Sequence, residues 1–441
     1  MSNYRPVAII SAIPKLLDKL IYNRMLKFCL KSISEKQHGF IPGRSTITNL
    51  ILFTNSIFSS FDRNNQLDAI YLDFRKAFDL INHKILLLKL KYYNFSFNMI
   101  KWLENYLSNR NSYVHIKGTK SRKFTAPSGV PQGSHLGPLL FLLFINDLPQ
   151  TIEFCNILLF ADDIKLFLEI SKEEDCLKMQ SDLNKITNWC NTNQLFLNFE
   201  KCFTITFSKH IIITFDYLLT TNTNCGRVDT IKDLGVIFDS KLTFNDHLAY
   251  VIGKANRSWG FVFRNTKSFK NPNTIKYLYL TLTKSVIMYA SAIWRPIGKI
   301  DMNRLERIQH KVLRHLAYLS GNPLSRYDHD YTSTAETFGL ASVTSSMIAS
   351  DVVIVYKIKS NHVKCLDLQN LIPIHNPNYV LRNRLSFYPD LPSSRHSEAN
   401  PIFRLSRCYN DLSQKLENPL DFSLNVSKVA VVFKMLTLVY K

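Results

Sequence analysis

The stretch NILLFADDIKLFL, residues 156–168, places two adjacent carboxylates between two short apolar runs. Asn156–Phe160 and Ile164–Leu168 have the length and composition of β-strands, which predicts a β-hairpin with Asp162 and Asp163 at its tip. Ala-Asp-Asp is a poor turn, because Asn-Gly or Asp-Gly is the usual choice between paired strands. From these residues alone two interpretations stay open: solvated turn residues, or carboxylates placed there for chemistry.

Another carboxylate follows a strand earlier in the chain. Asp68–Phe74 reads as a strand, and residues 75–92 change to a helical period, so Asp73 lies near the carboxyl end of that strand. If the strands share one sheet, Asp73 meets Asp162 and Asp163 on one edge. Further predicted elements are helices at Lys15–Leu30, Pro138–Leu148, about Glu173–Asn193 and within 333–360, and a strand at CFTITFS, residues 202–208.

Three carboxylates on one edge repel one another, and such a cluster usually holds divalent cations. Oxygen-only ligands indicate Mg²⁺ or Mn²⁺ rather than zinc. Two ions about 3.5–4 Å apart serve in-line phosphoryl transfer by activating the attacking oxygen and stabilising the leaving one. The constellation therefore predicts polymerase or nuclease chemistry.

The composition indicates a globular protein that binds a polyanion. The 441 residues are 46% hydrophobic and carry a formal net charge of +21. Residues Lys254–Arg314 contain thirteen basic and two acidic residues, so +11 of the charge lies there, interleaved with aromatic residues. This mixture suits phosphates and stacked bases. Amphipathic helices with ordinary solvated faces remain the alternative.

The cysteines and the apolar runs exclude other classes. The 8 cysteines form no Cys-x2-4-Cys pair, which argues against a zinc finger and favours free thiols in a reducing compartment. The longest apolar run, Leu139–Ile145, is too short to cross a bilayer, and MSNYRPVAII lacks the apolar core of a signal peptide. We therefore expect an intracellular chain, nuclear or cytoplasmic, with no membrane partner.

Seven blocks of sequence carry a family resemblance that covers about residues 4–315. In order they are YRPVAIIS, QHGFIPGRST, IYLDFRKAFDLINH, SGVPQGSHLGPLLFLLFINDLP, LLFADDIKLF, LNFEKC and DLGVIFDSKLTF. Their order and spacing resemble those of reverse transcriptases, most closely LINE-type, non-LTR retrotransposons of the jockey-like kind. Each block alone is weak evidence, whereas seven in sequence make coincidence improbable, so solvated turn residues become the poorer interpretation of FADD.

The resemblance implies a mixed α/β (α+β) fold, the right-hand polymerase with fingers, a palm of antiparallel sheet plus helices, and a helical thumb. We expect fingers and palm over residues 1–239, a basic helical thumb over 240–320 and a mostly helical C-terminal region of unknown role over 321–441. The chain starts at the RPV block, so we expect an N-terminally truncated fragment of a longer element, without its endonuclease.

The resemblance implies four catalytic residues. Asp73, Asp162 and Asp163 are the expected metal-binding carboxylates for Mg²⁺, with Mn²⁺ as an alternative. Lys201 follows LNFE and matches the lysine proposed to protonate the leaving pyrophosphate. By its residue type alone it is an ordinary surface lysine.

Five residues match nucleotide-binding positions of the family. Arg5 of the RPV block matches an arginine that grips the triphosphate. Phe78 matches the bulky position that crowds the 2′ carbon of the sugar, with a core aromatic as its alternative. Gln132 and Gly133 belong to the loop over nucleotide and template, with an ordinary loop at the start of a helix as the alternative, and Phe160 is equally a plain core aromatic.

The template and primer contacts are expected to come from the remaining matched residues. Arg44 in GRST is a candidate phosphate contact, with a solvated loop arginine as its alternative. Gly235 in DLGV resembles the turn that positions the primer end. Lys254, Arg257 and Arg264 belong to the basic helical segment expected to form the thumb.

The sequence thus predicts an RNA-directed DNA polymerase that extends a DNA primer on an RNA template. Its expected partners are the RNA template, the primer, the RNA–DNA hybrid and deoxynucleoside triphosphates. The alternative is a catalytically impaired nucleic-acid-binding remnant of such an element. Primer extension with Mg²⁺ distinguishes the two.

Overall fold

A computed structural model describes residues 8–108, 110–210, 213–325, 330–372, 387 and 397–415. The chain forms two compact units. Unit 1 consists of Met1–Ser45 and Asn65–Asp229, and unit 2 consists of Thr46–Asn64 and Thr230–Lys441. The two units differ from the three predicted ranges. Thr46–Asn64, from the range predicted as fingers and palm, belongs to unit 2, which also holds both the predicted thumb and the C-terminal region.

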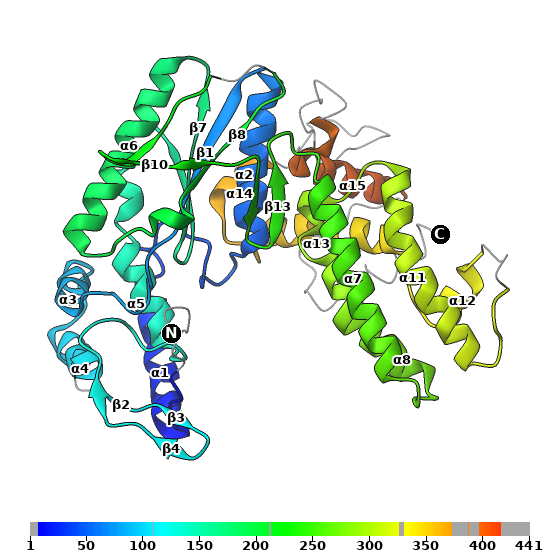
Figure 1. The fold of residues 1–441 in the computed structure, drawn as a ribbon, viewed down its shortest axis with the longest axis horizontal. Helices are drawn as coiled ribbons and strands as arrows, with labels where there is room; N and C mark the ends of the chain where they lie inside the picture. Colours follow the sequence, from blue (N-terminus) through cyan, green and yellow to red (C-terminus); the bar gives the residue numbers. More distant parts are fainter. Residues whose placement is uncertain are drawn as a thin grey trace. The chain divides into compact units, whose positions relative to one another are not determined.

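Unit 1 is built on a five-stranded sheet in the order β11-β8-β1-β7-β6. The central strand β1 (Gln66–Leu72) pairs antiparallel with β7 (Asp163–Ile170) and with β8 (Phe203–Phe207). Strand β6 (Asn156–Phe160) pairs antiparallel with β7, and the short β11 (Gly226–Arg227) runs parallel to β8. Figure 1 shows β1, β7 and β8 side by side. The predicted strands therefore share one sheet.

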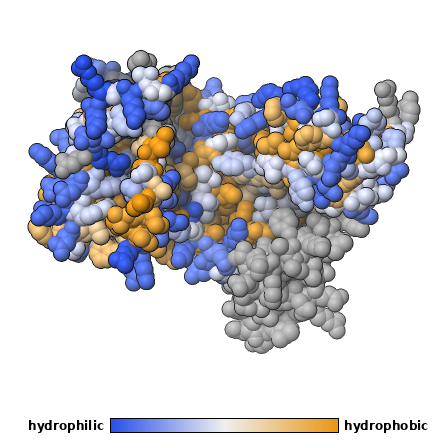
Figure 2. Space-filling model, turned by 90° about the horizontal axis from the view of Figure 1, so that it is seen from below, coloured by the Kyte–Doolittle hydropathy of each residue, from blue (hydrophilic) through white to orange (hydrophobic). Residues whose placement is uncertain are grey.

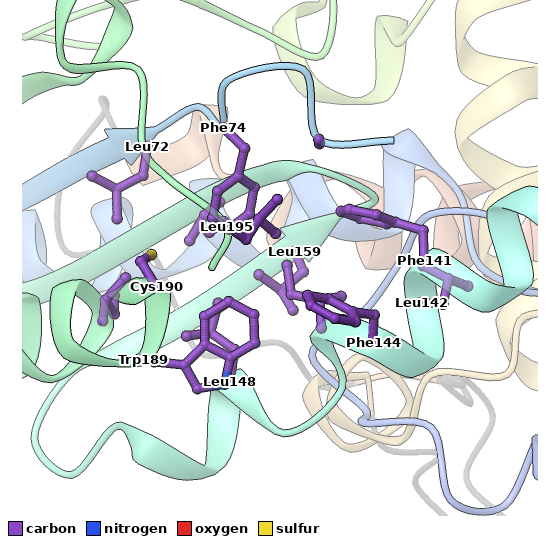
Figure 3. Packing of buried hydrophobic residues seen from close by; sticks show 14 of the residues in the cluster. Leu72, Phe74, Phe141, Leu142, Phe144, Leu148, Leu159, Trp189, Cys190 and Leu195 are labelled. Atoms are coloured by element: carbon purple, nitrogen blue, oxygen red, sulfur yellow. The ribbon is translucent and has the colours of Figure 1, made fainter. Parts of the chain in front are cut away.

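Helices α5 (Leu136–Ile145) and α6 (Glu173–Asn193) pack on one face of this sheet through a common core. Helix α5 is apolar on all sides, and every residue except Pro138 is buried, so it lies inside the unit. Burial of each large apolar side chain contributes about 1.5–3 kcal/mol. Figure 3 shows the core side chains of the sheet, α5 and α6 pointing toward one another, among them Leu72, Leu159, Phe141, Phe144, Trp189 and Cys190.

The other elements of unit 1 are helices, 3₁₀ turns and short strands. They are α1 (Ala12–Cys29), α3 (His83–Tyr92), α4 (Phe97–Ser108), the 3₁₀ turns Leu148–Thr151 and Phe199–Lys201, and the strands β2 (Asn111–Ser112), β3 (His115–Ile116), β4 (Thr119–Lys120), β5 (Phe124–Thr125), β9 (Leu218–Thr220) and β10 (Thr223–Asn224).

A buried carboxylate fastens α1 to the start of α5. Asp18 on α1 is 3% exposed and accepts hydrogen bonds from the backbone amides of His135 and Leu136 and from the Tyr106 hydroxyl. A carboxylate is favourable there, because the first amides of a helix have no partner within the helix.

The helix expected over 75–92 is only partly present. Residues 75–79 form turns and residues 80–82 are irregular. Helix α3 begins at His83, because Asn82 caps it by accepting hydrogen bonds from the amides of Lys84 and Ile85 at 2.9 and 3.2 Å. The strand expected at Asp68–Phe74 ends at Leu72. Phe78 therefore lies in a turn and not on a helix.

Unit 2 is mostly helical. Its elements are α2 (Thr46–Asp62), the hairpin β12 (Thr230–Asp233) and β13 (Val236–Asp239), α7 (Asn245–Asn265), α8 (Pro272–Leu278), the π-helix Tyr279–Lys284, α9 (Ser285–Met288), α10 (Ser291–Trp294), α11 (Lys299–Leu319), α12 (Thr332–Thr337), α13 (Val343–Lys359), α14 (Leu366–Leu371), the 3₁₀ turn Ser397–Ala399 and α15 (Pro401–Lys415).

Several aromatic residues of Lys254–Arg314 are core residues. Trp259 and Tyr279 belong to a hydrophobic cluster with α11, and Trp294 is 2% exposed. These rings are unavailable to stack on bases, which corrects part of the sequence interpretation. Phe261 and Tyr277 are 57% and 63% exposed, so the aromatic residues divide between core and surface.

The helices beyond residue 320 are tied to the predicted thumb by a buried charge cluster. Asp351 of α13, 0% exposed, forms ion pairs with Arg295 at 3.0 Å and with Arg404 of α15 at 3.4 Å. Arg404 also donates hydrogen bonds to backbone carbonyls at Ser291, Ala292 and Arg295. Removing one partner of such a cluster leaves a buried charge uncompensated, which is strongly destabilising. The cluster therefore binds these helices firmly into unit 2.

Hydrophobic side chains on the surface gather in separate patches among hydrophilic ones (Figure 2). In unit 1, α1 exposes Ile13, Leu16 and Leu20 by 83%, 60% and 55%. Of the helices in the described part of the chain, none combines the length and the apolar character needed to cross a bilayer.

Candidate active site

The acidic hairpin and the end of β1 meet at one end of the sheet of unit 1. Phe160 pairs with Asp163, so the hairpin turns over two residues, Ala161 and Asp162. Leu72, the last residue of β1, pairs with Ile164, so Asp73 and Asp163 are the next residues beyond this pair. The expected juxtaposition of β1 with the FADD turn is confirmed.

The two-residue turn explains how Ala-Asp replaces the usual turn residues. Ala161 has φ 56°, the left-handed conformation that favours glycine, so the hairpin contains a strained non-glycine residue at its first turn position. Asp162 is half-buried and Asp163 is exposed, and Phe160 is half-buried as well. Backbone strain of this kind persists where neighbouring structure supports it.

That support comes from Gln37 and Gly39, residues that our sequence interpretation did not single out. The Gln37 side-chain oxygen accepts hydrogen bonds from the amides of Ala161 at 2.9 Å and Gly39 at 2.8 Å, and Gln37 is 2% exposed. The backbone of residues 36–38 also bonds to Leu159, through the Leu159 amide to the Lys36 carbonyl and the His38 amide to the Leu159 carbonyl, both at 2.9 Å. The QHG segment therefore clamps the turn.

Gly39 lies against the turn itself. A Cβ atom at this position lies 2.4 Å from the amide nitrogen of Ala161 and 3.1 Å from the carbonyl carbon of Phe160. Only glycine fits this approach. The sequence signal was the glycine in the QHGF block, which by itself gives no partner for the close contact.

Asp73 is held by the segment that leads into β8. Its carbonyl accepts a hydrogen bond from the Asn198 amide at 2.7 Å, and Phe74 forms an isolated bridge with Leu197. The Lys201 ammonium lies 3.1 Å from the Asp73 carboxylate, with the two side chains 61% and 22% exposed. Because the Lys201 side chain is largely exposed, this ion pair contributes little to stability, and another cation can take the place of the ammonium at low cost.

The loop PQG lies close to Phe78. The Phe78 ring stacks on Phe141 with 4.6 Å between ring centres and meets Phe40 edge-on at 6.5 Å. Gln132 donates a hydrogen bond to the Asp79 carboxylate at 2.8 Å. Phe78 is half-buried, which suits both a ring that packs on the core and a ring that borders a nucleotide site. Gly133 has φ 104°, a conformation that favours glycine.

The two arginines predicted to contact substrate differ in what the structure describes. Arg44 donates hydrogen bonds to the carbonyls of Ser34 and Gln37, both at 2.8 Å, and pairs with Glu35 at 2.7 Å. Its side chain is 7% exposed, which rules out a solvated loop arginine. Arg44 therefore braces the QHG segment. Arg5 lies outside the described residues.

The donor set at the end of the sheet consists of carboxylate oxygens, the ligands that Mg²⁺ prefers. Within the described residues, no group of three or more His, Cys, Asp or Glu side chains is arranged to hold a metal ion. The residue types at this end of the sheet thus fit Mg²⁺, whereas the three carboxylates have not converged around a common point.

The residues predicted for the primer and the hybrid lie in unit 2. Leu234 and Gly235 have φ 42° and 90°, so the hairpin β12–β13 turns through a two-residue loop of the type I′ kind. A Cβ at Gly235 lies 2.9 Å from the Tyr289 ring, whose hydroxyl donates to the Leu234 carbonyl at 2.7 Å. Lys254, Arg257 and Arg264 are exposed on α7.

Comparison with known proteins defines the class. The sequence model of the reverse transcriptase (RNA-dependent DNA polymerase) family matches residues 1–281. The chain is 26% identical over 350 residues to a probable RNA-directed DNA polymerase from transposon BS of Drosophila melanogaster, a match that covers 74% of this chain and 38% of that protein. It is 27% identical over 339 residues to the RNA-directed DNA polymerase from mobile element jockey of the same species, covering 72% and 36%.

The chain belongs to the reverse transcriptase family, since the match covers more than half of its 441 residues. The predicted resemblance to jockey-like, non-LTR elements is confirmed. The chain spans less than two fifths of the length of these two relatives, at 38% and 36%. A solved telomerase from Candida tropicalis is similar over 76% of this chain and 54% of the telomerase chain, with a TM-score of 0.38 and 13% identity.

Proposed function

We propose that this chain is an RNA-directed DNA polymerase that extends a DNA primer on an RNA template. One observation carries the proposal: β1, which ends one residue before Asp73, pairs with β7, the strand that follows the turn bearing Asp162. Membership of the reverse transcriptase family supports it. The sheet of unit 1 then serves as the palm, and the basic helices of unit 2 serve as the thumb.

Asp73 and Asp162, with Asp163 beside them, are the residues that we assign to Mg²⁺, and Mn²⁺ suits the same oxygen donors. When bound, such ions activate a primer hydroxyl and neutralise charge on the leaving pyrophosphate. The clamp by Gln37 and Gly39 holds in place the turn that carries Asp162.

Lys201 is proposed to donate a proton to the leaving pyrophosphate. Its ammonium is 3.1 Å from the Asp73 carboxylate and largely exposed, which gives it access to a substrate at that end of the sheet. Asp73 would hold the ion through its carboxylate, and Lys201 would then present its ammonium to the phosphates.

Incoming deoxynucleoside triphosphate is proposed to lie between Phe78, Phe160 and the loop Gln132–Gly133. The hydrogen bond from Gln132 to Asp79 and the stacking of Phe78 on Phe141 support rigid walls for this site. Arg5 is retained as the triphosphate contact on the family match alone.

The hybrid of RNA and DNA is proposed to contact the exposed cations of α7, Lys254, Arg257 and Arg264. Gly235 is proposed to lie at the primer end, since its turn has no room for a side chain. Arg44 acts on the template indirectly, because its guanidinium bonds to the segment 34–37 that it braces.

Primer extension on an RNA template with Mg²⁺ tests the proposal. The wild-type chain should extend the primer, and Asp162→Asn should abolish extension with hybrid binding retained, because the change removes a metal-binding charge and keeps the size. Asp216→Asn is the matched control, an exposed aspartate of the same unit. Hybrid binding without extension by the wild type would favour a nucleic-acid-binding remnant. Full activity of Asp162→Asn would remove this residue from the metal site.

A further inference from the structure

A strongly basic ribbon projects from unit 1 between the end of α4 and the PQG loop. Residues Arg110–Thr125 contain five basic residues and no acidic one: Arg110, Lys117, Lys120, Arg122 and Lys123. Apart from the half-buried Arg110 and Ser112, every residue of this segment is exposed. Figure 1 shows β2, β3 and β4 in this ribbon, in cyan.

The ribbon is a hairpin made of two short strand pairs, β2 with β5 and β3 with β4. Asn111 pairs with Thr125, and His115 pairs with Lys120, after a register shift at Ser121, which bonds to Val114 through both its amide and its hydroxyl at 2.9 Å. Its tip, Lys117–Gly118, has positive φ at both residues, 47° and 86°, which is the turn that suits twisted strands.

Within the described part of the chain, the positive charge of the ribbon is not balanced by carboxylates. Among the described residues, none of the five cations forms an ion pair with a carboxylate. Five like charges on sixteen residues repel one another, and a polyanion that neutralises them releases its own counterions on binding.

Exposed rings accompany these cations. Tyr113 and Phe124 are 47% and 49% exposed, and the Lys120 ammonium lies 5.1 Å from the centre of the Tyr113 ring. At the base of the ribbon the Arg110 guanidinium lies 5.1 Å from the Tyr106 ring, which itself stacks on Trp102 at 5.2 Å. Cations beside exposed aromatic faces suit an unpaired strand, whose bases are free to stack.

The base of the ribbon is anchored beside the candidate nucleotide site. Ser128 donates a hydrogen bond to the Asp79 carbonyl at 2.9 Å, and the Gly129 amide donates to the Ile81 carbonyl at 2.8 Å. The Val130 amide then donates to the Phe78 carbonyl at 2.8 Å. A strand held by the ribbon therefore lies next to the residues that we assign to the incoming nucleotide.

We propose that the ribbon Arg110–Thr125 is a docking arm for single-stranded RNA, the part of the template that has not yet been copied. The cations contact its phosphates, and Tyr113 and Phe124 stack on its bases. The choice of template RNA rests on the proposed polymerase function, whereas binding of single-stranded RNA to the ribbon is testable without any chemistry.

The test is the binding of a 20-nucleotide polyuridine RNA by the full chain, without nucleotides or metal, over a range of salt concentrations. The variant K117Q/K120Q/R122Q/K123Q should bind more weakly, and the log-log salt slope should fall by about 0.7 for each phosphate that the variant no longer neutralises. The matched control is K15Q/K19Q/R24Q/K27Q, which removes the same charge from exposed positions of α1 in the same unit.

A second variant separates stacking from charge. Tyr113→Ala should weaken binding by about 5- to 150-fold with the salt slope unchanged, since a stacked base is lost without any cation. Equal losses in the ribbon and α1 variants would overturn the proposal in favour of diffuse attraction. Unchanged RNA binding in the ribbon variant, with or without weaker binding of an RNA–DNA duplex, would also overturn it. Failure of primer extension alone would count only against the proposed polymerase function.

Discussion

Replacing Gly39 by alanine should impair catalysis with little loss of nucleic-acid binding. The added methyl group lies 2.4 Å from the amide nitrogen of Ala161, whereas side-chain carbons are essentially never found closer than 3.0 Å to such an atom. The turn or the QHG segment must therefore move by at least 3.0 − 2.4 = 0.6 Å. Because backbone atoms form the contact, no side-chain rotation relieves it.

The displaced turn carries Asp162, so the movement changes the position of a proposed metal ligand. A misplacement of about 1 Å can cost about 100-fold in rate, and 0.6 Å should thus lower the rate of extension by about 10- to 100-fold. Forcing a methyl group into a filled space also costs about 1–3 kcal/mol of stability.

The assay is single-turnover primer extension at saturating nucleotide, beside urea unfolding and hybrid binding. Gly226→Ala is the control, because a Cβ there meets only Phe203 ring atoms at 3.6 and 3.8 Å, which is ordinary contact. The control should extend primers at the wild-type rate. Wild-type rate and wild-type stability in Gly39→Ala would refute the clamp.

Three further predictions concern other parts of the molecule. Phe78→Val should open space beside the sugar and raise ribonucleotide incorporation relative to deoxynucleotides; unchanged discrimination with surviving activity assigns Phe78 to the core. Replacing Lys254, Arg257 and Arg264 by glutamine should lower the log-log salt slope of hybrid binding by about 0.7 to 0.9 for each phosphate left without its cation, whereas an unchanged slope marks a solvated face. Burial lowers the pKa of His38 from 6.5 to about 3, so unfolding free energy should fall as the pH drops from 6.5 toward 3, by at most about 1.4 kcal/mol per pH unit. In urea unfolding His38→Gln should show a smaller pH slope, and an equal slope contradicts this assignment.

Local patterns predicted the elements that have one strong signal. The apolar run before FADD and the run after it gave the hairpin, and the period of residues 173–193 gave α6 with the observed bounds. The same reasoning extended α3 too far toward its start, because Asn82 caps the helix that begins at His83 by bonding the amides of Lys84 and Ile85, and this cap outweighs the apolar period. It also treated the aromatic residues of the basic helices as one group. Their exposure differs, because it depends on which neighbouring elements each ring packs against.

By itself the sequence determined the family and the presence of the acidic hairpin. It also determined that Asp73 follows the strand before it. These features depend on residue type, order and spacing along the chain. Only the tertiary structure decided that Gln37 and Gly39 clamp the FADD turn, that Arg44 braces a loop, and that the C-terminal helices belong to unit 2. The contacts of the clamp join residues more than a hundred positions apart, as between Gln37 and Ala161, and no local propensity encodes which partner a buried amide or a glycine meets.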